Sequence, residues 1–329
     1  MSSALPNRSH TLTFSFKSFR IGTSEILLLL VTAVWGSSYA VSKQAMQHVA
    51  VLDFVALRFG LTFLLLMPAV LPLLAKSSRG SMWVGGLLGF NLFAVIACES
   101  FGVLNTSATN AAFLIGTTAV ITPFMEWWTL GRRPSSRVLW AALACLAGAA
   151  LLARPGNGTF AFGLGESLML GAAVLRALMV CLTEKHRDER LSPIAVTALQ
   201  CGMVAVLAWG LGRASRDSAQ PVAPLPVAPE FWIALVYLVL LCTIFAFFAQ
   251  NYSVPRVGPS RVAMLLGCEP LFGVLFAVLL LGESVRSTDW LGGALIVLAA
   301  WSVIRVSTST KPLDAPGLPV RHPGPGGVH

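Results

Sequence analysis

The sequence predicts an all-α polytopic membrane protein with ten transmembrane helices, arranged as two inverted five-helix repeats. Three observations support this prediction. Of the 329 residues, 56% are hydrophobic and 11% are charged, whereas soluble domains carry about 25% charged residues. Apolar stretches near the length needed to cross a bilayer, about 20 residues, recur along the chain. The first half of the chain also resembles the second.

The apolar stretches follow one another through short connections, which leave no room for a soluble domain. The predicted spans are 25–43, 52–75, 82–101, 107–129, 138–153, 163–183, 192–212, 230–252, 259–281 and 288–306. A cleaved signal peptide is the alternative for the first span, but the stretch is long for one and no small-residue cleavage site ends it. The tails, 1–24 and a disordered Pro/Gly tract at 307–329, are expected to be solvated.

The net charge of +9 is better explained by orientation in the membrane than by a nucleic-acid partner. Sixteen of the 23 Lys and Arg residues lie in tails and loops on the side of the N-terminus, five lie on the other side, and Arg58 and Arg176 lie within spans. Cytoplasmic loops carry an excess of Lys and Arg. We therefore expect an inner-membrane protein with both termini in the cytoplasm.

Enzymatic activity has little support in the sequence. There is no G-x-x-x-x-G-K-[ST] phosphate-binding loop, no His within a predicted span and no Asp at mid-span. All six Cys residues lie in spans without a C-x-x-C pair, so no disulfide is expected. We expect no cofactor and no metal. The expected partners are a small-molecule solute and the lipid bilayer, and the sequence leaves open whether the chain forms a homodimer.

The two halves align over five spans each. For example, "TLGRRPSSRVLWAALACLAGAALL" (129–152) resembles "LLGESVRSTDWLGGALIVLAAWSV" (280–303). Because five is odd, the second copy must cross the membrane in the opposite sense. Inverted repeats are typical of secondary transporters, whose substrate sites lie near the midplane where the repeats meet. The predicted units are a first repeat at 25–153, an external linker at 154–162 and a second repeat at 163–306.

Several segments, in this order, make residues 25–306 resemble the EamA-type members of the drug/metabolite transporter superfamily. They are "AVWGSSYAVSKQA", "ALRF", "TSATNAAFLIGTTAVITP", "LSPIAVTALQ" and "RVGPSRVAMLLGCEPLFGVLFAVLLLGE". The resemblance implies a ten-helix inner-membrane carrier, commonly an exporter of amino acids or related metabolites. The sequence departs from the family at Arg176, where an aromatic residue, usually Trp, commonly stands, matching Trp35 in the first half.

The fourth and ninth spans differ in the position of their proline. Pro123 lies eight residues before Gly131, whereas Pro270 lies twelve before Gly282. Proline bends a helix by removing one backbone hydrogen bond. If these prolines set the bends, the two halves bend at depths that differ by about one turn.

Polar side chains are concentrated outside the fifth and tenth spans, which indicates that the other helices surround a polar cavity. The candidate substrate-binding or pathway residues are Trp35, Ser37, Ser38, Arg58, Glu99, Thr118, Thr122, Arg176, Gln200, Gln250 and Asn251. The candidates for proton coupling are Glu269 and Glu126. A charged group at bilayer depth costs about 2.5–3.5 kcal/mol on insertion scales, so such residues are functional candidates by default.

Each charged candidate also has a structural interpretation. Arg58 can line the cavity, extend toward the outer surface or pair with Asp53. Arg176 lies about 13 residues into its span, where it can line the pathway and bind a carboxylate or extend toward the cytoplasm. Glu126 can anchor the helix at the interface, and Glu269 can stabilise the helix break at Pro270. Glu99 is left ambiguous.

The function that the sequence favours is secondary active export of a small organic metabolite, such as an amino acid or a related carboxylate-bearing solute. Transport would proceed by alternating access and be coupled to protons or to the solute gradient. The alternatives are a membrane sensor or regulator that transports nothing, and a broad-specificity drug efflux carrier of the same fold.

Overall fold

The computed structural model describes residues 22–106, 108–152, 163–187, 191–215, 225–281 and 287–306, and within these ranges it contains helices and no strands. The predicted linker and C-terminal tail lie outside these residues. The helices of the first half are α1 (Thr23–Ala45), α2 (Val51–Leu74), α3 (Arg79–Leu104), α4 (Ala108–Gly116), α5 (Thr118–Leu130) and α6 (Ser136–Leu152). Those of the second half are α7 (Leu164–Lys185), α8 (Pro193–Ala214), α9 (Pro229–Tyr237), the π-helix η3 (Leu238–Phe245), α10 (Ala246–Val257), α11 (Pro259–Leu266), α12 (Glu269–Leu281) and α13 (Ser287–Val306).

Six helical segments in the described ranges are long and apolar enough to cross a membrane. They are α1, α2, α3, α7, α8 and the continuous rod formed by α9, η3 and α10. The apolar parts of α6 and α13 are shorter, and the predicted fourth and ninth spans are each divided into two short helices. By length and composition, therefore, six of the ten predicted spans qualify individually as membrane crossings.

The breaks in the two divided spans lie at equivalent positions. Thr117 separates α4 from α5, and its N–H donates to Leu114 O at 3.1 Å. Cys268 lies just before α12, and its N–H donates to Leu265 O, also at 3.1 Å. Each lies fourteen residues before the glycine that follows its predicted span, Gly131 or Gly282. The predicted difference in depth is therefore wrong, because Pro123 lies inside the continuous helix α5 and does not set the break.

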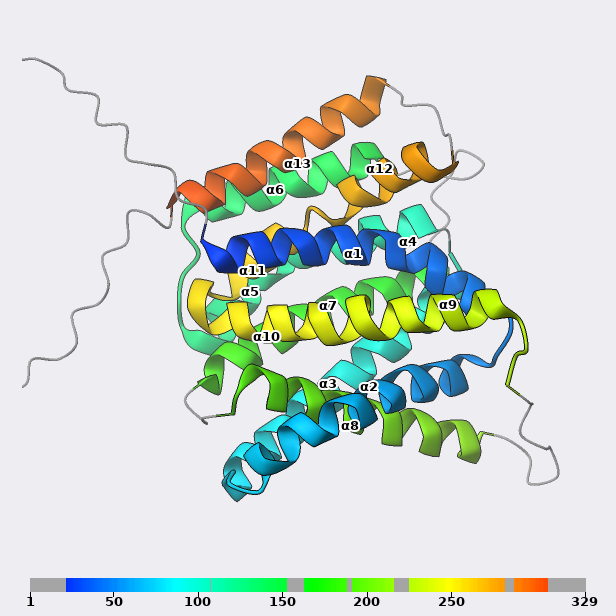
Figure 1. Ribbon diagram of the computed structural model, residues 1–329. Coiled ribbons are helices and arrows are strands. Elements are labelled where there is room, and N and C mark those ends of the chain that lie inside the picture. The colour runs from blue at the N-terminus through cyan, green and yellow to red at the C-terminus, as the bar shows by residue number, and fades with distance from the viewer. Residues whose placement is uncertain are drawn as a thin grey trace, which may run out of the picture.

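The helices pack in pairs around a central α1 (Figure 1). α2 packs on α8 and α3 on α7, while α6 and α13 pack together at the edge of the bundle. α1 lies between the α9–η3–α10 rod and the α11–α12 pair. α1 and α12 approach most closely at Gly36, where an added Cβ would lie 2.9 Å from the carbonyl oxygen of Glu269.

The two ends of the bundle differ in their polar contacts. At one end Arg261 pairs with Glu25 at 2.5 Å, Arg132 pairs with Glu184 at 3.0 Å, and Ser260 donates to Glu126. We call this the arginine-rich end. At the opposite end Lys43 Nζ donates to Thr106 O at 2.9 Å, and Thr106 Oγ1 donates to Glu166 at 2.5 Å. α1 begins at the arginine-rich end, whereas α7 begins at the opposite end.

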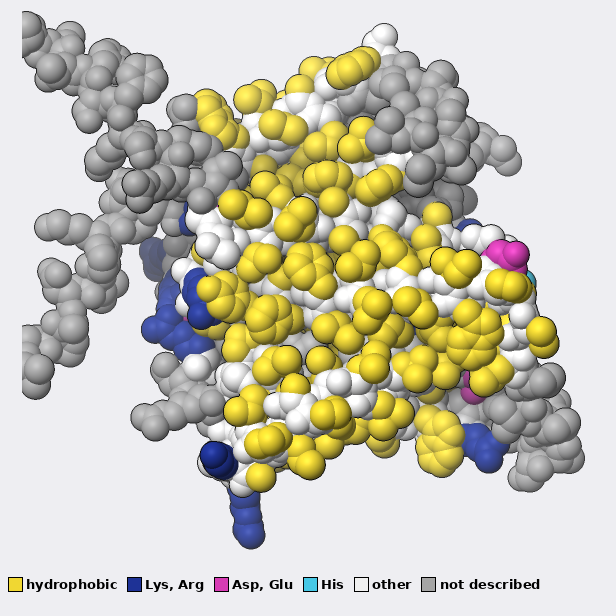
Figure 2. Space-filling view, viewed as in Figure 1, with side chains coloured by type: hydrophobic (Ala, Val, Ile, Leu, Met, Phe, Trp, Pro, Cys, Tyr) yellow, Lys and Arg dark blue, Asp and Glu magenta, His cyan; other side chains and the backbone are white. Residues whose placement is uncertain are grey.

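The outer surface of the bundle is apolar. Figure 2 shows hydrophobic side chains across the middle of the visible face, with Lys and Arg gathered mainly at the arginine-rich end. Large side chains such as Trp83, Trp140 and Ile233 are about 70% exposed (69%, 73% and 71%). An apolar surface of this extent is suited to contact with lipid rather than with water.

Candidate functional site: a charged cluster between two cavities

The centre of the site is Arg176, which α7 places against α1. The guanidinium carbon lies 4.4 Å from the centroid of the Trp35 ring. Only 9% of Arg176 and 4% of Trp35 is exposed. A desolvated cation over an indole face is stabilised by about 2 kcal/mol or more. This contact fixes the arginine beside α1 instead of allowing it to extend toward either end of the bundle.

Two carboxylates neutralise the arginine from different helices. Arg176 Nε lies 3.0 Å from Glu99 Oε1 on α3, and Arg176 Nη1 lies 3.4 Å from Glu269 Oε2 on α12. Glu269 is the first residue of α12, so its negative charge lies at the positive end of the helix dipole. Buried charges of this kind require such partners, because their removal from water is costly.

A π-helix holds the indole of Trp35 in place. Its Nε1–H donates to Cys242 O at 3.0 Å. Cys242 lies in η3, and the N–H of Ala246 at the end of this segment bonds Leu241 O and Thr243 O, bypassing Cys242 O. Cys242 O accepts the indole hydrogen bond instead of one from Ala246. Short π-helical segments within helices are frequent at functional sites.

Arg58 lies in the same cavity as Arg176 instead of extending outward. Its Nε donates to Thr243 Oγ1 at 2.8 Å, and Thr243 Oγ1 donates in turn to Leu238 O at 2.8 Å. The guanidinium also lies 5.3 Å from the centroid of the Phe59 ring. The cavity-lining interpretation of Arg58 therefore describes its position best.

The larger of two cavities lies beside this cluster and has a volume of about 50 Å³. Its charged lining consists of two cations and two anions, so the charges are balanced: Arg58, Arg176, Glu99 and Glu269. The aromatic side chains of Trp35, Tyr39, Phe54 and Phe247 complete much of the wall. The chemistry of this lining suits a small solute that carries both an apolar part and a charged group, for which the cavity would have to widen.

Ser37 and Ser38 follow Trp35 on α1, and their hydroxyls bond to protein groups. Ser38 lines the larger cavity, and its Oγ donates to Trp35 O at 2.8 Å. Ser37 Oγ lies 2.5 Å from the hydroxyl of Tyr237 and donates to Val34 O at 2.9 Å. Ser37 therefore links α1 to α9.

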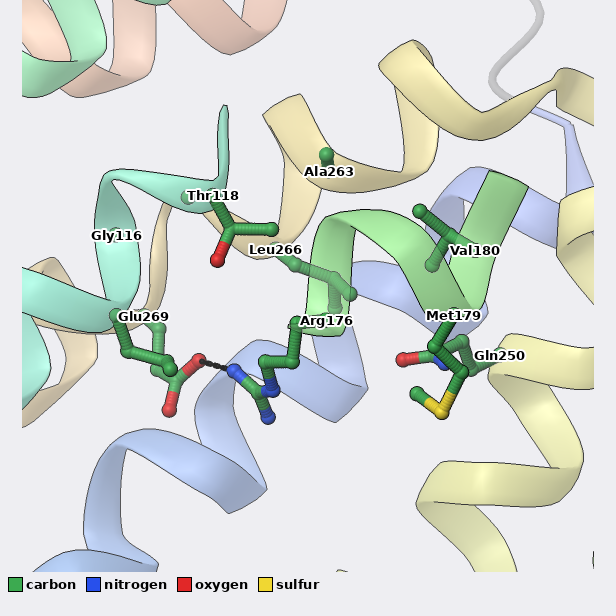
Figure 3. Close-up of a pocket in the computed structure, with 11 residues that line it drawn as sticks. Gly116, Thr118, Arg176, Met179, Val180, Gln250, Ala263, Leu266 and Glu269 are labelled. Carbon is green, nitrogen blue, oxygen red and sulfur yellow. Dashed lines mark hydrogen bonds and ion pairs between the residues drawn. The ribbon is translucent and has the colours of Figure 1, made fainter. Parts of the chain in front are cut away.

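A smaller cavity adjoins the Arg176–Glu269 ion pair (Figure 3). Thr118 and Gln250 line it, together with the two charged residues. In Figure 3, Arg176 lies between Glu269, to which a dashed line joins it, and the side chains of Met179 and Gln250. Thr118 and Gln250 thus share a chamber with the central arginine.

The remaining predicted site residues line neither of the two cavities. Asn251 Nδ2 donates to Gln200 Oε1 at 2.7 Å and to Thr197 Oγ1 at 3.0 Å, which links α10 to α8. Thr122 Oγ1 donates to Thr118 O within α5. Glu126 lies at the arginine-rich end, where it accepts hydrogen bonds from Ser260 and lies 3.8 Å from Arg132. Glu126 therefore does not belong to the central cluster.

Sequence reasoning missed several residues of the site. Tyr39 and Ser42 line the larger cavity, and Thr243 orients Arg58. Tyr39 is one helical turn after Trp35, so its position on the same helix face was a usable signal. Nothing comparable marks Thr243, because its contact with Arg58 depends on how η3 packs against α2.

Comparison with known proteins identifies the family of the chain. A sequence model of the EamA-like transporter family matches residues 22–154 and 163–305. A "probable amino-acid metabolite efflux pump" of Escherichia coli is 25% identical over 283 residues, which cover 83% of this chain and 91% of that protein. An "uncharacterized transporter" of Archaeoglobus fulgidus is 25% identical over 285 residues, covering 84% of each chain.

A solved crystal structure shares the fold at 19% identity, with a TM-score of 0.70 over 87% of this chain and 97% of the other. The two matches to the family model together cover well over half of the sequence. The chain belongs to the EamA-like transporter family.

Proposed function

We propose that this protein is a secondary active transporter that exports a small carboxylate-bearing solute, such as an amino acid or a related metabolite, across the inner membrane. The observation that carries the proposal is the buried Arg176, held between two carboxylates in the wall of a cavity. Arginine binds carboxylates in a bidentate manner. A solute carboxylate can therefore replace Glu99 or Glu269 as the partner of Arg176.

The proposed architecture is ten membrane crossings in two inverted five-helix repeats. Two features support it. α1 begins at the arginine-rich end and α7 at the opposite end, as expected if the halves are inverted. The helix breaks at Thr117 and Cys268 occupy equivalent positions in the two halves. In this arrangement the non-helical backbone lies beside the cavity, where broken helices are tolerated in transporters.

The proposed mechanism is alternating access between two states. The larger cavity is lined by the parts of α1, α2 and α3 nearest the opposite end. The arginine-rich end is closed by the Arg261–Glu25 and Arg132–Glu184 ion pairs and by the Ser260–Glu126 hydrogen bonds. Opening of the arginine-rich end would require these contacts to separate while the contacts at the opposite end close.

Proton coupling is assigned to Glu269 in this proposal. When a solute carboxylate takes the place of Glu269 on Arg176, the displaced acid is left buried without its cation. A buried carboxylate without a partner binds a proton instead of remaining charged. The Glu269 side chain is 2% exposed, and so depends on Arg176 more than the Glu99 side chain, which is 15% exposed. Glu126 has no part in this step, because its contacts lie at the arginine-rich end.

The arginine-rich end is assigned to the cytoplasm, which places both termini there. The gathering of Lys and Arg at this end in Figure 2 supports the assignment, because positive charge is enriched on the cytoplasmic side of membrane proteins. The printed name of the Escherichia coli relative, an amino-acid metabolite efflux pump, supports the outward direction of transport.

Comparative metabolomics of culture medium tests the function whichever carboxylate-bearing solute is carried. Cells that overproduce the protein should release more of at least one such metabolite than cells that lack it. The Arg176→Gln/Glu269→Gln double variant is the control, because it removes the binding charge together with the more deeply buried of its two carboxylate partners. Identical media from all three strains would contradict the proposal.

A further inference from the structure

The larger and the smaller cavity share two lining residues, Arg176 and Glu269. These residues form an ion pair, drawn in Figure 3 with the smaller cavity, so the pair lies in the wall of both chambers. Arginine has five N–H donors arranged in a fork, so it can serve both chambers.

The chambers follow one another along the axis of the bundle. The larger cavity takes Ser42 and Met46 from the end of α1 that lies near the opposite end. The smaller one takes Val180 from the last turns of α7 and Ala263 from the middle of α11, both nearer the arginine-rich end. A solute that leaves one chamber past the ion pair therefore enters the other.

The smaller chamber contains an amide without a partner. Gln250 is 2% exposed, and its Nε2 has no hydrogen-bond acceptor among the described residues. Its neighbour Asn251, by contrast, donates two hydrogen bonds to α8. A buried donor without an acceptor is costly, and such a group in a chamber wall is available to a ligand.

We propose that the smaller cavity is a second binding position for the transported solute, on the arginine-rich side of the ion pair. This inference rests on the proposed function and specifies its path. The solute carboxylate stays on Arg176 while it displaces Glu269, and the Gln250 amide donates to a carboxylate or carbonyl oxygen once the solute has passed. The chamber has a volume of about 10 Å³ in this conformation, room for about one water, so the solute can occupy it only when the arginine-rich end opens and the chamber widens.

Transport measured separately from each side tests the role of Gln250. Sealed vesicles of known orientation are given an equimolar mixture of the twenty proteinogenic amino acids, and each is quantified by mass spectrometry. Gln250→Leu should raise KM about tenfold for solute presented from the arginine-rich side, the effect of one lost hydrogen bond. KM from the other side should not change.

Asn251→Leu is the matched control, since it is one residue away and lines neither of the two cavities. It is expected to lower stability and to change KM equally from both sides. An equal change from both sides for Gln250→Leu, or no change from either, would overturn the proposal.

Cysteine labelling tests the partition without reference to transport. A membrane-impermeant thiol reagent should modify Thr118→Cys only from the arginine-rich side and Ser38→Cys only from the other side, with native cysteines resolved by mass spectrometry. In the Arg176→Gln/Glu269→Gln background, each site should become reactive from both sides.

Labelling of Thr118→Cys from the opposite side of the intact protein, or from neither side, would contradict a separate chamber. If labelling is sided but no amino acid moves, the chambers stand and the proposed solute class fails. The two failures can thus be told apart.

Discussion

Arg176 stacks on Trp35 at 4.4 Å, a contact that joins α7 to α1. Both residues are buried, so the contact places a positive charge inside the bundle. Glu99 on α3 and Glu269 on α12 neutralise this charge. The stability of the centre therefore depends on all four side chains together.

Removal of the central arginine should destabilise the protein. Arg176→Gln leaves two carboxylates buried together, and loss of one partner from a buried ion pair costs about 3–5 kcal/mol. The loss of unfolding free energy should become smaller as the pH falls, because protonation removes the repulsion between Glu99 and Glu269. Unfolding in mixed detergent micelles, measured between pH 5 and pH 8, checks both statements.

The Arg176→Gln/Glu269→Gln double variant is the control for this experiment. It restores a balance of one Arg and one Glu in the cavity and should recover most of the lost stability. If the losses of the two single variants simply add, the two side chains are not coupled.

Neutralisation of Glu269 should uncouple solute transport from the proton gradient. Glu269→Gln keeps the size and hydrogen-bonding shape of the side chain but cannot exchange a proton. The folded variant should therefore lose flux driven by a pH difference in proteoliposomes while it retains solute counterflow. Glu99→Gln is the matched comparison and should keep the pH response with an altered KM. An unchanged pH response in Glu269→Gln would exclude the assignment.

The two contacts of Trp35 can be separated by substitution. Trp35→Phe retains an aromatic face for Arg176 but loses the hydrogen bond to Cys242 O, which should cost about 1 kcal/mol. Trp35→Leu loses both contacts and should cost about 2 kcal/mol more. Equal unfolding free energies for the two variants would show that the stacking contributes nothing.

The close crossing of α1 and α12 should not tolerate a methyl group. A Cβ at Gly36 would lie 2.9 Å from both Glu269 O and Phe272 Cβ. Gly36→Ala should therefore destabilise the protein by about 1–3 kcal/mol. Gly171→Ala in α7 has open space around its Cβ and is the control, expected to be neutral or stabilising by up to about 1 kcal/mol. Similar thermal stability of both variants would contradict the close packing.

Much of the fold was predictable from hydropathy, because the helices α1, α2, α3, α7 and α8 coincide closely with long apolar stretches. The π-helix at 238–245 was not, since an apolar run does not distinguish a π-helix from an α-helix and its carbonyl partner, Trp35, is 207 residues away. Proline was a poor guide to the helix breaks. Both breaks are instead single turns with hydrogen bonds to the third residue back.

The charged members of the site were predictable because charge is rare in this chain, and their grouping was not. Arg58, Arg176, Glu99 and Glu269 stood out individually, but the same criterion also selected Glu126. Glu126 contacts Ser260 and Arg132 at the arginine-rich end, and the sequence alone does not predict these contacts. Gln200 and Asn251 were selected for their polarity, although buried amides satisfy one another as readily as they bind a solute.

The role of Arg176 as the carboxylate-binding group is tested most directly by transport of matched solutes. Purified protein in proteoliposomes is offered each amino acid together with its amide, in which an uncharged carboxamide replaces the carboxylate. The flux of both compounds is measured by mass spectrometry. The wild-type protein should move at least one amino acid well ahead of its amide, and the Arg176→Gln/Glu269→Gln variant should lose that preference. Equal flux of acid and amide through the wild-type protein would contradict the assignment.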